Sequence, residues 1–166
     1  MKELLSKLSS YNLFNYLFPG VISVLMLKEF AGYDVVQESL VFGAFLYYFV
    51  GMVVSRFGSL VIEPILTKSS FVKFADYASF VIASSKDEKV DMFSEINNMY
   101  RTLISAIVLV IGGRVYHELA DLLNISKTFS MSLLLIALIL LFVLSYRKQT
   151  KYVVKRVEVN TKKNVV

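Results

Sequence analysis

The stretch MSLLLIALILLFVLSY, residues 131–146, contains no charged side chain and decides the fold class of this chain. A transmembrane helix needs about 20 mainly apolar residues, and three further apolar stretches precede this one within the 166 residues. With 56% hydrophobic residues, 19% charged residues and a mean hydropathy of +0.61, the chain is too apolar for a soluble domain of its size. We therefore predict an all-α integral membrane protein built as a four-transmembrane-helix bundle.

The spacing of the apolar stretches predicts a single membrane domain, 1–166, with spans at approximately 13–30, 39–62, 100–122 and 128–146. Pro19 either kinks the first span or ends a separate short helix there. The second span is expected to end before Pro64, because a proline disfavours helix in the residue ahead of it. A short helical connector, 67–98, and a basic tail, 147–166, complete the chain.

The connector and the tail carry weaker local signals. Ser85 and Glu88 have the spacing of a capping box, which predicts a helix start at Ser85. Apolar positions at helical spacing then continue into the third span, so we expect one long helix from the connector into the bilayer. The stretch 152–159 shows a partial two-residue alternation and allows a short strand.

Charge asymmetry predicts the orientation of the spans. Placing both termini and the region 56–101 in the cytoplasm leaves only Lys28, Arg114 and Lys127, of 18 Lys and Arg, on the other side. Short cytoplasmic loops are enriched in Lys and Arg. The expected location is therefore a bacterial inner membrane with both termini cytoplasmic.

Small residues recur along one face of the second span, where they allow another helix to approach closely. These candidate helix-association residues are Gly43, Gly51, Ser55 and Ser59. Two interpretations stay open: packing against another helix of the same chain, and self-association of several copies.

Three groups of charged residues are further candidates. Asp87, Asp91 and Glu95 form a carboxylate stripe that is either a solvated face or a cytoplasmic contact, with a partner or with the basic tail. A second set is expected to meet the membrane surface or a partner: Arg56, Arg147, Lys148, Lys151, Lys155 and Arg156. Pairs four residues apart predict an outer polar cluster of Arg114, His117, Glu118 and Asp121.

Several chemistries have no signature in the sequence. The chain has no cysteine, which excludes disulfides and thiolate nucleophiles. It also lacks a Walker loop, GxSxG, HExxH, a dinucleotide fingerprint and an EF-hand loop. We expect no catalytic residues, no cofactor, no metal site and no nucleic-acid partner. The protein is therefore not predicted to be an enzyme.

A few spans joined to a small cytoplasmic element form a layout that is similar to compact membrane components of bacterial antiviral systems. The resemblance is one of layout, and no residue is carried over from it. The expected function is a membrane sensor or effector that assembles with itself or with a cytoplasmic partner. Membrane permeabilisation in antiviral defence is the effector activity that this layout suggests. The alternative is a passive anchor or accessory subunit that recruits a soluble partner.

Overall fold

The computed structural model describes residues 12–163, and every regular element in that range is helical. The elements are η1 (Leu13–Leu17), α3 (Phe18–Ala31), α4 (Leu40–Phe57), η2 (Gly58–Ile62), α5 (Glu63–Lys68), α6 (Tyr77–Ser84), α7 (Glu88–Leu122) and α8 (Lys127–Lys163). Four continuous helices are long and apolar enough to cross a membrane: Leu13–Ala31, Leu40–Lys68, Glu88–Leu122 and Lys127–Thr161. The prediction of an all-helical chain with four such helices is confirmed. Lys2 and Lys7, which contributed to the predicted orientation, lie outside the described residues.

Both prolines lie inside continuous helices, and each follows a π-helical turn. The π turn η1 precedes Pro19, and the π turn η2 precedes Pro64. A proline in an α-helix removes one hydrogen bond and pushes against the carbonyl four residues before it, and a π turn widens the helix at that point. The first helix is therefore not divided at Pro19. The expected end of the second span at Ile62 is wrong, because the helix continues to Lys68.

The long helix α7 extends from the connector through the third apolar stretch, as the periodicity predicted, but its start differs. Asp87 is the N-cap and accepts a hydrogen bond from the Lys89 amide at 2.9 Å. The predicted capping box at Ser85 is wrong, because Ser85 is the C-cap of the preceding helix and its hydroxyl donates to the Ile82 carbonyl. Ser85 therefore ends α6 and does not begin α7.

Helix α8 joins the last apolar stretch to the basic tail without a break over 37 residues. The short strand suggested by the alternation at 152–159 is wrong, because these residues are helical. A strand there would need a partner edge for its backbone groups, and no strand occurs in residues 12–163. The helix satisfies the same groups locally.

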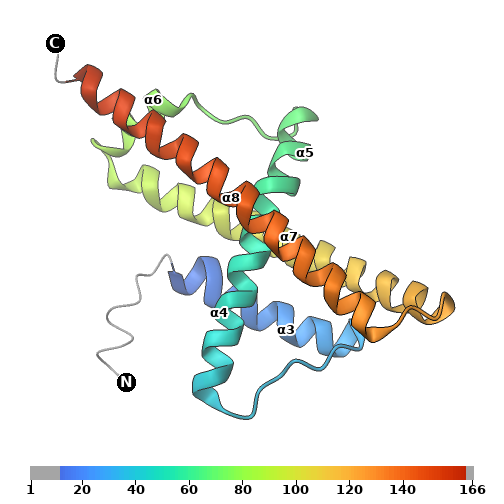
Figure 1. Ribbon diagram of the computed structural model, residues 1–166. Coiled ribbons are helices and arrows are strands. Elements are labelled where there is room, and N and C mark those ends of the chain that lie inside the picture. Colours follow the sequence, from blue (N-terminus) through green and yellow to red (C-terminus); the bar gives the residue numbers. More distant parts are fainter. Residues whose placement is uncertain (1–11, 164–166) are drawn as a thin grey trace.

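The four long helices form a bundle in which α4 runs across α3, α7 and α8 (Figure 1). The crossing of α3 and α4 is set by two glycines. A Cβ atom on Gly20 would overlap the Tyr47 carbonyl, and one on Gly51 would overlap the Tyr16 carbonyl. The two backbones are therefore in direct contact at this point.

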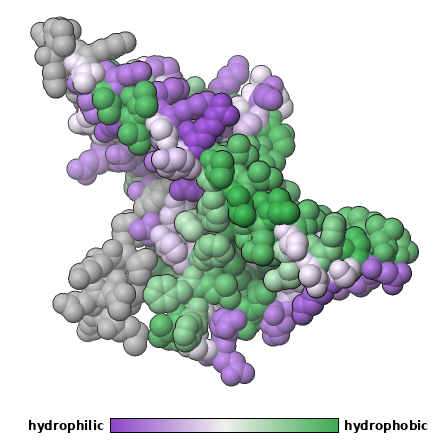
Figure 2. Space-filling model, viewed as in Figure 1, coloured by the Kyte–Doolittle hydropathy of each residue, from purple (hydrophilic) through white to green (hydrophobic). Residues whose placement is uncertain are grey.

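Polar and apolar side chains gather on different parts of the molecule. Hydrophilic side chains gather around α6 and the last turns of α8, whereas apolar side chains cover the crossing helices (Figure 2). We call α6, residues 88–100 of α7 and residues 147–163 of α8 the head. Most of the buried side chains of the crossing helices are small or polar, and they include Asn15, Ser23, Thr102, Ser105 and Ala106. This composition is typical of helices that pack inside a membrane, where close approach replaces the hydrophobic effect.

Candidate functional site

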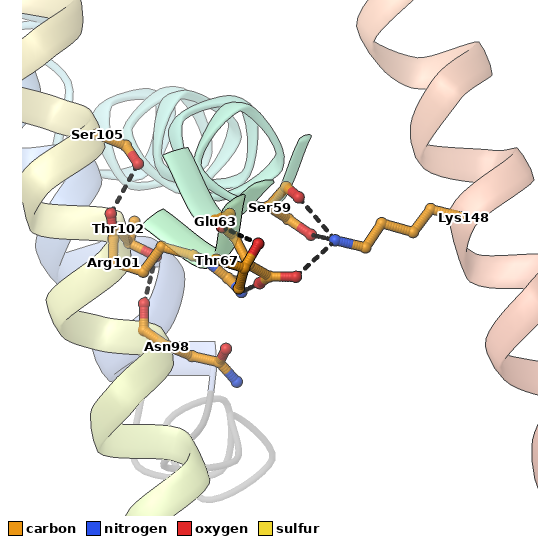
Figure 3. Close-up of polar contacts among 8 residues, drawn as sticks. All are labelled: Ser59, Glu63, Thr67, Asn98, Arg101, Thr102, Ser105 and Lys148. Carbon is orange, nitrogen blue, oxygen red and sulfur yellow. Dashed lines mark hydrogen bonds and ion pairs between the residues drawn. The ribbon is translucent and has the colours of Figure 1, made fainter. Parts of the chain in front are cut away.

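A carboxylate held between two cations joins three helices at the boundary between the apolar helices and the head. Glu63, in the first turn of α5, accepts hydrogen bonds from the Arg101 guanidinium of α7 and from the Lys148 ammonium of α8. The Lys148 contact is 2.9 Å long. Figure 3 shows Arg101 and Lys148 reaching Glu63 from opposite sides. We call Ser59, Glu63, Arg101 and Lys148 the ion cluster.

The π turn before Pro64 creates part of this site. The Glu63 amide donates to the Gly58 carbonyl, and Pro64 has no N–H to donate. The Ser59 carbonyl is consequently left without a backbone donor from the next turn. Lys148 supplies one, since its Nζ lies 2.6 Å from the Ser59 carbonyl oxygen and 2.8 Å from the Ser59 Oγ. The Ser59 carbonyl, left free by the irregular turn of the second helix, thus accepts a hydrogen bond from Lys148 of the fourth helix.

The ion cluster is largely shielded from solvent by the chain. The side chains of Glu63, Arg101 and Lys148 are 18%, 19% and 26% exposed, respectively. Hydrogen bonds to charged groups contribute about 1.5–3 kcal/mol each, and removing one member of a buried pair leaves an uncompensated charge. Because the cluster holds two cations and one carboxylate, loss of Glu63 would leave Arg101 and Lys148 without their shared counter-ion. Glu63 is therefore the residue on which the cluster depends.

Close packing of η2 and α7 fixes Arg101 beside Glu63. A Cβ atom on Gly58 would overlap the Ser105 Oγ, so the second and third helices touch one turn from the cluster. The hydroxyls of Thr102 and Ser105 donate to carbonyls of their own helix, at 2.7 Å each, and leave no donor pointing into the contact. Figure 3 shows both hydroxyls directed along α7.

The predicted helix-association residues lie mostly inside the chain. Gly51 contacts α3, and Ser55 is buried as well. Gly43 is buried beside the ring of Tyr47, one turn further along its own helix. Ser59 belongs to the ion cluster. These positions therefore serve contacts within one chain, and no second copy is needed to explain them.

The predicted charged groups separate into different environments. Asp87, Asp91 and Glu95 form no ion pair with the tail among the described residues, and Asp87 caps α7. The tail instead meets α6, where the rings of Tyr77 and Tyr152 lie 5.9 Å apart. The contact of the connector with the tail is thus aromatic.

Of the predicted surface-basic residues, two are engaged within the chain. Lys148 belongs to the ion cluster, and Arg56 donates to the Tyr16 hydroxyl at 3.1 Å. Arg147, Lys151, Lys155 and Arg156 are exposed. The proposed role at a membrane surface or partner stays open for these four.

The outer polar cluster contains both expected pairs. Arg114 and Glu118 form a 2.7 Å ion pair, and His117 lies 3.9 Å from Asp121. The His117 ring also packs on Tyr33, with ring centroids 5.4 Å apart. Within residues 12–163 no group of three or more His, Cys, Asp or Glu could hold a metal ion.

Sequence reasoning missed the partnership of Glu63 with Arg101 and Lys148. Glu63, directly ahead of Pro64, and Ser59, one turn earlier, are local signals for a polar site, but they do not identify its partners on other helices. No protein-family model, curated protein or solved structure matches this chain.

Proposed function

We propose that this protein is a multi-span membrane protein in which the head and the membrane spans are mechanically coupled, and that it acts as a sensor or effector rather than as an enzyme. It assembles with itself or with a cytoplasmic partner. The observation that carries this proposal is the ion cluster, which ties α7 and α8 to α5 where the apolar helices meet the head.

The lengths of two helices support the coupling. Helix α7 has 35 residues and α8 has 37. At a rise of about 1.5 Å per residue, each helix is more than about 50 Å long, whereas the hydrocarbon core of a bilayer is about 30 Å thick. Both helices therefore extend beyond the bilayer on the side of the head. Because each helix is continuous from the head into its span, a displacement of the head would move both spans.

The proposed orientation places the head in the cytoplasm of a bacterial cell, with the spans in the inner membrane. The exposed Arg147, Lys151, Lys155 and Arg156 are favoured beside the cytoplasmic leaflet, which is negatively charged. In the resting arrangement the ion cluster holds α7 and α8 against α5. Its rupture releases the two helices and permeabilises the membrane.

A membrane-potential assay tests this mechanism. Cells that overproduce the wild-type chain, Glu63→Gln or Glu158→Gln are compared with a potential-sensitive dye. We expect Glu63→Gln to depolarise cells several-fold more than the wild type, because the neutral amide no longer balances Arg101 and Lys148. Glu158→Gln is the matched control, since it makes the same substitution at an exposed position of α8.

Size-exclusion chromatography of each variant in detergent establishes whether it is folded. Lys148→Met is a second variant, which removes the contacts of Lys148 and leaves the Glu63–Arg101 ion pair in place. Equal membrane potentials for folded wild type, Glu63→Gln and Lys148→Met would contradict the effector mechanism. That result would favour a passive anchor for a soluble partner. An antiviral role stays a prediction from layout.

A further inference from the structure

Helix α8 is the least packed of the four long helices. None of the residues in its most apolar window is buried within the chain, whereas 33% of the corresponding window of the first helix is buried. Its contacts with the rest of the chain are confined to one side. Lys148 reaches Ser59 and Glu63, Ser145 is buried, Tyr152 packs on Tyr77, and the Phe142 ring lies 6.1 Å from that of Phe49 at the edge of this side.

The other side of α8 carries a regular pattern. In residues 131–146 the β-branched side chains are Ile136, Ile139 and Val143, and all other apolar positions are Leu, Met, Ala, Phe or Tyr. Their spacing of three and four residues continues past the apolar stretch. The complete stripe, which we call the α8 seam, is Ile136, Ile139, Val143, Tyr146, Thr150, Val153 and Val157.

The seam has the period of a coiled coil. Apolar residues that alternate at intervals of three and four occupy positions a and d of a heptad repeat, and the seam sustains this over three heptads. Thr150 is exposed, and every other member of the seam is more than half exposed. With 3.6 residues per turn, the seam lies on the side of α8 away from Lys148.

Contact with lipid does not account for the seam. A helix that faces lipid needs apolar residues but no heptad period, and it needs none beyond the hydrocarbon. Beyond Tyr146 the neighbouring positions turn basic, with Arg147, Lys151, Lys155 and Arg156, while the seam keeps Val153 and Val157. Valines left in water there would lose the stabilisation of burial.

We infer that α8 forms a parallel coiled coil with α8 of a second copy of this chain through the α8 seam. All copies insert into a membrane with one orientation, so the same helix runs in the same direction in each, as a parallel coiled coil requires. The a positions of the seam are Ile136, Val143, Thr150 and Val157, all β-branched, and β-branched residues are common at the a positions of parallel coiled coils.

The flanking positions are compatible with this pairing. In a parallel pair, each g residue faces the e residue of the next heptad in the partner helix. Gln149 then faces Val154, Arg156 faces Thr161, and Arg147 faces Phe142, whose ring also packs on Phe49 of its own chain. No two like charges are opposed. The ion cluster lies on the opposite side of α8 and stays intact. The inference rests on the self-assembly included in the proposed function and names the surface responsible for it.

Cysteine crosslinking in membranes tests the inference, and the cysteine-free chain gives no background. Ile139→Cys and Val153→Cys place a thiol on the seam within the span and within the head. Ala137→Cys and Lys155→Cys are matched controls, because they are exposed and lie on the other side of the same turns. With a mild oxidant we expect both seam variants to shift to twice the 18.9 kDa mass of the chain, and both controls to stay monomeric.

Equal crosslinking of seam and control variants would show random collisions and overturn the inference. Crosslinking of Ile139→Cys without Val153→Cys would overturn a seam that continues into the head. The readout needs no activity, so it is separate from the effector mechanism. Specific seam crosslinking in cells whose Glu63→Gln variant causes no depolarisation would uphold the coiled coil while contradicting the effector.

Discussion

At the scale of single residues, Gly20 and Gly51 determine how α3 and α4 cross. Each lies where a Cβ atom would overlap a backbone carbonyl of the facing helix, and backbone cannot move aside as a side-chain tip can. Gly112, by contrast, has no atom of another part of the chain within 4 Å of its hypothetical Cβ. Small residues in these apolar helices therefore differ in role, and their type alone does not reveal it.

These glycines give a paired prediction. Gly51→Ala should lower the thermal unfolding midpoint of the detergent-solubilised protein, because overpacking a close contact costs about 1–3 kcal/mol. Gly112→Ala makes the same chemical change in open space and should leave the midpoint unchanged or raise it, since alanine favours helix over glycine by about 0.5–1 kcal/mol. Circular dichroism during heating measures both. Equal effects of the two substitutions would contradict the assigned contact.

The same geometry bears on the design of assembly experiments. A bulky residue at Gly51 would disturb the α3–α4 contact within each chain, so a change in oligomeric mass would not report on self-association. Substitutions on the exposed side of α8 avoid this problem.

At the scale of elements, the sequence predicted helix existence well and helix ends less well. The long helix α7 and the apolar part of α8 follow from periodicity and hydropathy, which are local properties. The continuation of the helix through Pro64 and the helical conformation of the tail depend on contacts with other parts of the chain. Lys148 of α8 donates a hydrogen bond to the Ser59 carbonyl before Pro64, and Tyr152 of the tail packs on Tyr77 of α6.

The docking of the tail on α6 is testable by crosslinking. A chain with Tyr77→Cys and Tyr152→Cys should be joined within one molecule by a short bis-maleimide, because the two rings are neighbours at 5.9 Å. Tyr77→Cys combined with Lys151→Cys is the control, since Lys151 is exposed and lies a quarter turn or more around α8. Mass spectrometry identifies the linked peptides. A higher yield for the control pair would refute the docking.

At the scale of the whole molecule, the described helices divide into crossing apolar segments and a polar head (Figure 2). If α7 and α8 both cross the bilayer, the loop between them and the tail must lie on opposite sides. This arrangement is part of the proposal and follows from helix length and composition.

Thiol labelling of intact cells tests it. Leu123→Cys, in the exposed turn after α7, should react with a membrane-impermeant maleimide added outside. Lys151→Cys, in the tail, should react only after the membrane is permeabilised. Labelling of both variants before permeabilisation, or of neither, would contradict a pair of opposed spans with a cytoplasmic tail.

Hydropathy, helix periodicity and charge, which are read over short windows of sequence, were sufficient to predict the helical class, the four apolar segments and the candidate residues on each. The folded arrangement was needed to show that Gly51 serves a contact within the chain and that Glu63 binds Arg101, 38 positions away, and Lys148, 85 positions away. Such contacts depend on how helices cross. A crossing is fixed by the shapes of two distant surfaces together, which no local window of sequence contains.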